Sequence, residues 1–88
     1  MEALKIETDS KGGATTLRLI GRLQAEHVTQ LKKEIEDRSA ERVCLREVTL
    51  VDADVVRFLT ACEENGISIV NCSAYIREWM DREREQMD

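Results

Sequence analysis

The chain has 88 residues and a formal net charge of −5, and hydrophobic residues make up 42% of it. This length gives room for one domain with a modest core, over residues 1–88. Lysines and arginines alternate with acids instead of forming a basic stripe, so we expect no nucleic-acid partner. No apolar run approaches the roughly 18 residues of a membrane span, and the first residues lack an apolar signal core. We therefore expect a cytoplasmic protein with no membrane partner.

The three cysteines, Cys44, Cys62 and Cys72, lie inside apolar segments. Without a secretory signal, such residues are typical of buried, reduced thiols. Their spacings of eighteen and ten residues differ from the paired spacing of zinc ligands. The only histidine, His27, precedes a predicted helix and is expected to be solvated. The sequence predicts no metal site and no cofactor.

A hairpin is predicted at the start of the chain. Leu4 and Ile6 alternate with polar residues, which is the period of a half-buried strand. Residues 9–13 (DSKGG) are turn formers, and residues 16–20 alternate again. Gly21 then ends or kinks the second strand.

Three helices and two strands follow. Helical spacing of apolar residues predicts helices over 25–38 and 53–65, with a short strand at 43–45 between them. A strand at 67–71 precedes a last helix, which begins near Ser73 as its N-cap. The charged residues from about 82 to 88 are expected to form a tail.

This order of elements predicts an α/β fold with a mixed four-stranded sheet, in which an antiparallel hairpin is joined to parallel strands. Most strands alternate apolar and polar residues, so about three helices should lie mainly on one face of the sheet. Ile20, Cys44 and Val70 would give the other face some apolar character.

Three segments together resemble the STAS domain, the fold of anti-sigma factor antagonists and of the cytoplasmic tails of sulphate transporters. The segments are residues 17–23 (LRLIGRL), 43–52 (VCLREVTLVD) and 69–73 (IVNCS). The resemblance covers roughly residues 3–82. It implies a STAS-like single domain that binds a partner protein, such as an anti-sigma factor or a related kinase.

The resemblance also gives meaning to the loop after the third strand. In antagonists this loop resembles Asp-Ser-Ser-Gly, and its first serine is phosphorylated by the partner kinase. Here Asp52 matches the Asp, Ala53 stands at the phosphoacceptor, Asp54 at the second serine and Val55 at the glycine. Ala53 has no hydroxyl, so this position cannot be phosphorylated. Gln24 also replaces an Asp that usually follows the second strand.

Two interpretations of residues 52–55 stay open. The acids could serve only as an N-cap and as favourable charges at the helix dipole. Alternatively, the turn and the exposed face of the next helix, including Arg57 and Thr60, form a partner-binding surface. Asp54 would then imitate a phosphate only in part, since it carries less charge.

Catalysis is not expected. A P-loop needs G-x-x-x-x-G-K, but the glycines stand only at 12, 13, 21 and 66. An aspartyl-phosphate receiver domain needs a lysine at the end of a later strand, but the last lysine of this chain is Lys33. The thiols have only His27 as a base. The alternative to a protein-binding module is a small-ligand domain that uses the helix N-terminus at 52–55, and a homodimer stays open. On the last helix, Tyr75 and Trp79 either both pack on the sheet or leave one ring exposed for docking.

Overall fold

The computed structural model describes residues 4–86. Its elements are β1 (Leu4–Lys11), β2 (Ala14–Leu23), a 3₁₀ turn (Ala25–His27), α1 (Val28–Arg38), β3 (Arg42–Val51), α2 (Ala53–Glu64), β4 (Ser68–Val70) and α3 (Ala74–Gln86). The four strands form one sheet in the order β1-β2-β3-β4, with β1 antiparallel to β2 and the other pairs parallel. The predicted mixed sheet is confirmed. Within residues 4–86, no helix is long and apolar enough to cross a membrane.

The hairpin is tighter and longer than predicted. Lys11 pairs with Ala14, so the loop is only Gly12 and Gly13, with φ of 59° and 83°. Two positive φ values in a two-residue loop match the twist of the flanking strands, and glycine adopts them without strain. The prediction that residues 9–11 belong to the turn was therefore wrong, because they continue β1.

β3 is also longer than the predicted strand at 43–45. The pairing with β2 continues as far as Leu23 and Val51, across two register irregularities. These irregularities interrupt the alternation of apolar and polar residues, which is why the sequence pattern indicated a shorter strand. One of them lies between Gly21 and Arg22, so Gly21 kinks β2 and does not end it.

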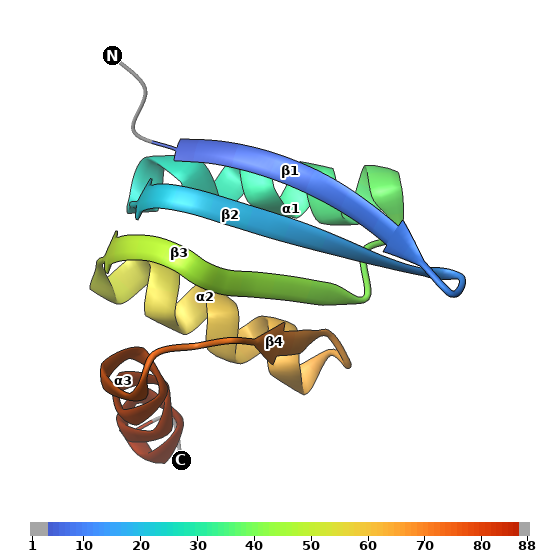
Figure 1. Ribbon diagram of the computed structural model, residues 1–88. Coiled ribbons are helices and arrows are strands. Elements are labelled where there is room, and N and C mark those ends of the chain that lie inside the picture. The colour runs from blue at the N-terminus through green and yellow to red at the C-terminus, as the bar shows by residue number, and fades with distance from the viewer. Residues whose placement is uncertain (1–3, 87–88) are drawn as a thin grey trace.

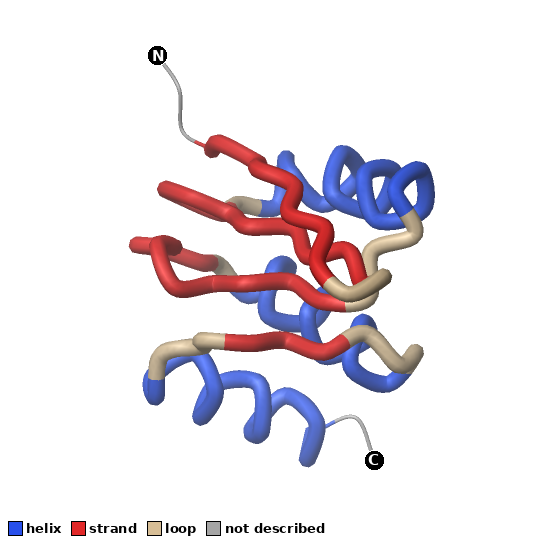
Figure 2. Tube along the Cα trace, turned by 45° about the vertical axis from the view of Figure 1, so that its right-hand side comes forward, coloured by secondary structure: helices blue, strands red, loops and turns tan. Residues whose placement is uncertain are grey.

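The helices lie on one face of the sheet, as predicted. Figure 1 shows α1 behind β1 and β2 and α2 behind β3, and Figure 2 shows the same two layers from another side. α3 lies at the β4 end of the sheet, against α2. The core between the layers contains these buried residues: Leu17, Leu19, Leu23, Leu31, Ala40, Val43, Leu45, Val51, Val55, Val56, Leu59, Cys62, Ile69, Ile76 and Met80.

The helix ends follow the chemistry expected from the sequence. The Ser73 hydroxyl accepts a hydrogen bond from the Ile76 N–H at 3.3 Å, so Ser73 caps α3 as predicted. α2 ends before Asn65 and Gly66, where the Gly66 N–H donates to the Glu63 carbonyl at 3.1 Å. α3, however, continues through residues 82–86, which were predicted to be tail. Residues 87 and 88 lie outside the described residues.

Candidate functional site

Asp52 lies at the turn between β3 and α2, and both of its carboxylate oxygens are hydrogen-bonded. Oδ1 accepts from the Val55 N–H at 3.0 Å, which is the predicted N-cap of α2. Oδ2 accepts from the Ala25 N–H at 2.8 Å. The second bond joins two loops that are 27 residues apart in sequence. Asp52 therefore fixes the turn before α2 to the turn before α1.

His27 supports the same region from the other loop. Its Nδ1 accepts from the Gln24 N–H at 3.0 Å, so the imidazole satisfies a backbone donor at the end of β2. Only 12% of the His27 side chain is exposed. The prediction of a solvated histidine was wrong, because the ring folds back over its own turn.

Three of the candidate residues on α2 remain accessible. Asp54 and Arg57 have 63% and 57% of their side chains exposed and form an ion pair in which Arg57 Nη1 donates to Asp54 Oδ1 at 3.1 Å. Ala53 is partly exposed between Asp52 and Asp54. The turn that Asp52 fixes by its two hydrogen bonds, which we call the clamped turn, thus presents a methyl group, a carboxylate and a guanidinium to solvent. We call Ala53, Asp54 and Arg57 the turn surface.

The structure removes two other candidates from that surface. Val55 and Thr60 are fully buried, each with 0% exposure. The Thr60 hydroxyl donates to the Val56 carbonyl at 2.9 Å, so its polar group is satisfied within α2. The prediction that Thr60 lies on an exposed helix face was wrong, because it stands four residues after Val56 on the buried stripe.

The two aromatic residues of α3 differ in exposure. Tyr75 is 52% exposed, whereas Trp79 packs against the core, and their ring centroids are 6.3 Å apart. An exposed Tyr75 ring next to a partly buried Trp79 ring matches the second of the two arrangements that the sequence left open. Whether Tyr75 contacts a partner stays a prediction.

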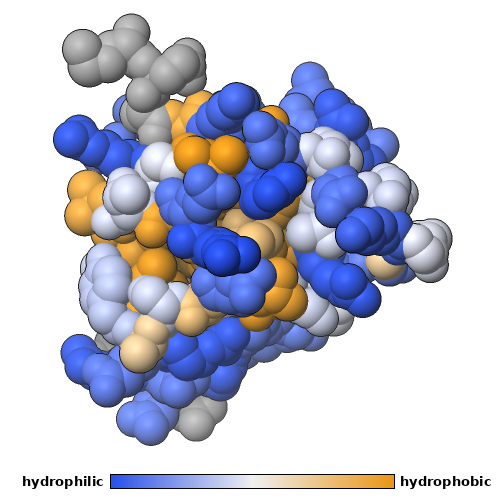
Figure 3. Space-filling model, in the orientation of Figure 1, coloured by the Kyte–Doolittle hydropathy of each residue, from blue (hydrophilic) through white to orange (hydrophobic). Residues whose placement is uncertain are grey.

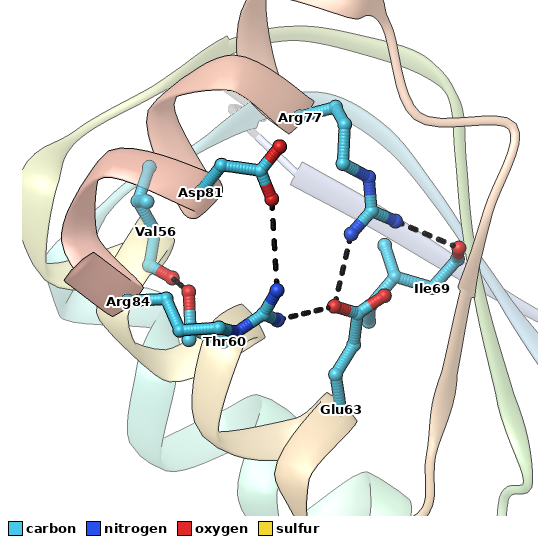
Figure 4. Close-up of polar contacts among 7 residues, drawn as sticks. All are labelled: Val56, Thr60, Glu63, Ile69, Arg77, Asp81 and Arg84. Atoms are coloured by element: carbon cyan, nitrogen blue, oxygen red, sulfur yellow. Dashed lines mark hydrogen bonds and ion pairs between the residues drawn. The ribbon is translucent and has the colours of Figure 1, made fainter.

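An ionic cluster fastens α3 to the rest of the domain (Figure 4). Glu63 Oε1 accepts from Arg77 at 2.9 Å and from Arg84 at 2.7 Å, and Arg77 also donates to the Ile69 carbonyl at 3.4 Å. The hydrogen bond from Arg77 is the main cause that lowers the pKa of Glu63 below its ordinary 4.5. This cluster was not predicted from the sequence, although the spacing of Arg77 and Arg84 by two helical turns places them on one face.

Cys62 and Cys72 have little nucleophilic character. Burial raises the pKa of Cys62 from 9.0 to about 11, and burial also raises the pKa of Cys72. Cys62 lies in a hollow of about 450 Å³ between α1 and α2, together with Ile35, Phe58 and Ile67. A buried thiol that stays protonated at neutral pH contributes to the packing of the core as a small hydrophobic side chain.

We expect Cys62 to react slowly with iodoacetamide. At pH 8 the two-unit difference in pKa lowers the thiolate fraction about 100-fold relative to an ordinary cysteine. Mass spectrometry of the native and urea-unfolded protein, alkylated under otherwise equal conditions, would measure the ratio of Cys62 modification rates. Equal rates in the two states would contradict a buried, protonated Cys62.

Within residues 4–86, no group of three or more histidine, cysteine or acidic side chains is arranged to hold a metal ion. No protein-family model matches the chain, and a search of curated proteins finds no match.

Proposed function

We propose that the chain is a non-catalytic, STAS-like interaction module that binds a regulatory protein, such as an anti-sigma factor or a related kinase, through the turn surface. The observation that carries the proposal is the clamped turn. Asp52 uses both oxygens to hold the backbone, which leaves Asp54 and Arg57 displayed at a fixed place. A surface ordered before binding loses less entropy when a partner docks.

The proposed module acts without phosphorylation at this loop. Ala53 stands at the position that the STAS resemblance assigns to the phosphoacceptor, and its methyl group cannot accept a phosphoryl group. The nearby Thr60 hydroxyl is buried and hydrogen-bonded, so a kinase could reach it only after α2 opened. The module would therefore keep one fixed binding state. Its two buried free thiols, Cys44 and Cys62, favour a reducing compartment such as the cytoplasm.

The alternative, a small-ligand domain at the N-terminus of α2, has less support. A ligand there would have to use the first-turn N–H groups, and the Val55 N–H already donates to Asp52. The Asp52 and Asp54 carboxylates would also repel an anion. The hollow between α1 and α2 is lined by none of residues 52–55.

The test compares partner capture by matched variants. The Asp54→Ala/Arg57→Ala variant removes both charged groups of the turn surface and leaves Asp52 in place. The control is Lys33→Ala/Asp37→Ala, which removes one charge of each sign from exposed positions on α1. Each protein is immobilised and exposed to an extract of the native host, and the retained proteins are quantified by mass spectrometry.

We expect at least one protein to be retained by the wild type and the control but about tenfold less by the Asp54→Ala/Arg57→Ala variant, as for central interface residues. Circular dichroism would confirm that both variants are folded. Equal recovery of every retained protein by all three chains would refute the turn surface as the docking site.

A further inference from the structure

The sheet has a second face, turned away from the helices, and three arginines converge on it. A hollow of about 420 Å³ on this face is lined by Arg18, Arg42 and Arg46, with Cys44 and Val70 among the other lining residues. In the orientation of Figure 1, the space-filling view shows hydrophilic residues over the middle of this face, with apolar residues between them (Figure 3). The volume lies in the range of small-ligand sites.

The strand register places Cys44 at the centre of the three arginines. Arg42 precedes it by two residues along β3, and Arg46 follows it across a register irregularity and also lines the hollow. Arg18 is its register partner on β2, and Val70 is its partner on β4. Cys44 is 7% exposed and accepts a hydrogen bond from Asn71 Nδ2 at 3.4 Å. The three arginines therefore flank Cys44 on three sides, before and after it on β3 and beside it on β2.

The charge of this hollow contrasts with that of the whole chain. Three arginines face a single lining carboxylate, Asp9, in a chain with a net charge of −5. Among residues 4–86, no carboxylate pairs with Arg42 or Arg46 within 4.0 Å, and Arg18 makes one contact, to Glu7 at 3.5 Å. Like charges gathered in this way repel one another, so an anion between them would be stabilising.

We propose that this hollow binds the terminal phosphoryl group of a phosphate monoester, with its oxygens between Arg18, Arg42 and Arg46. A phosphate monoester carries between 1.5 and 2 negative charges at neutral pH, roughly the excess of the lining residues. It presents three oxygens in three directions, whereas a carboxylate presents two in one plane. Arginine binds both carboxylates and phosphoryl groups, but donors that approach from three sides fit the tetrahedral phosphoryl group better than the planar carboxylate. The site is independent of the turn surface.

Inorganic phosphate is the first probe. It is titrated into ¹⁵N-labelled protein at constant ionic strength while backbone amide shifts are followed by NMR. We expect saturable changes, with a Kd on the order of 1 mM, confined to the strands around Arg18, Arg42 and Asn71. Changes that are linear up to high concentration, or that are scattered over the surface, would contradict the proposal.

Charge-matched variants locate the site. Arg42→Gln/Arg46→Gln removes two of the three cations and is expected to raise the Kd for phosphate about tenfold. Lys33→Gln/Arg22→Gln removes the same charge from exposed positions outside the hollow and should leave the Kd within about twofold. Equal weakening by both variants would mean that only the net charge matters, and the proposed site would be rejected.

Three further ligands define the chemical class. Glycerol 3-phosphate represents a free metabolite, and an N-acetylated phosphoserine amide represents a modified side chain of another protein. We expect both to bind through the same arginines, and the tighter of the two identifies the source of the phosphate. Acetate at the same ionic strength should bind at least about tenfold more weakly. If acetate binds as tightly as phosphate, the site does not select phosphoryl groups.

Discussion

Replacing Asp52 by alanine is expected to lower the free energy of unfolding by about 2–3 kcal/mol. The change removes the N-cap of α2, worth about 0.5–2 kcal/mol, and the charge-assisted bond to the Ala25 N–H, worth about 1.5–3 kcal/mol. The sum is not fully additive because both bonds end on one carboxylate. Urea denaturation followed by circular dichroism at pH 7 measures the loss.

Asp54→Ala is the matched control for this prediction. Asp54 has 63% of its side chain exposed and, among residues 4–86, pairs only with Arg57 on the same helix, so its removal should change stability by no more than about 0.5 kcal/mol. Asp52→Asn should fall in between, because the two N–H groups are bound by different oxygens and the amide replaces one of these oxygens by an NH2 donor. A loss at Asp52 no larger than that at Asp54 would show that the link between the two loops does not stabilise the domain.

Glu63→Gln is expected to cost about 1–2 kcal/mol at pH 7. Glu63 receives hydrogen bonds from Arg77 and Arg84, so neutralising it leaves two guanidinium groups without their shared carboxylate. The expected loss of unfolding free energy is moderate because both arginine side chains are partly exposed to water. Glu64→Gln is the control, since the neighbouring carboxylate is exposed. Urea denaturation of the three proteins measures the difference.

The cost of Glu63→Gln should depend on pH. The pKa of Glu63 is lowered in the folded state, chiefly by the hydrogen bond from Arg77, so its stabilising effect is fully present above the ordinary value of 4.5. The effect is lost as the pH falls through the lowered folded-state pKa, because the carboxylate then takes up a proton. The difference between wild type and Glu63→Gln should therefore shrink from pH 7 to pH 3. A difference that stays constant over this range would contradict the ionic cluster.

Features that depend on residues close together in the sequence were predicted well. The N-caps at Asp52 and Ser73 join residues three apart, and the mixed sheet follows from the order of the elements. The buried stripe of α2 also follows from its periodicity.

Contacts between distant segments could not be predicted in the same way. Nothing local indicates that the second oxygen of Asp52 meets Ala25, or that Arg84 reaches Glu63, 21 residues away. The charge of residues 82–86 suggested a solvated tail, but Glu83 and Arg84 are held by partners on α2. Thr60 was predicted to be exposed because its side chain is polar, but its hydroxyl can donate to a carbonyl of its own helix and so be buried.

The shortness of β4 has a consequence for how the domain opens. β4 has three residues, and in the part of the chain that the structure describes it pairs only with Arg42, Val43 and Cys44 of β3, while α3 makes its main contacts with α2. The hairpin and β3 share a much longer ladder of backbone hydrogen bonds. Because few backbone hydrogen bonds hold β4, we expect residues 68–86 to open locally before β1, β2 and β3 separate, although Ile69, Ile76 and Met80 then leave the core. The Glu63 cluster joins α2 to α3, so we expect protonation of Glu63 at low pH to favour this opening.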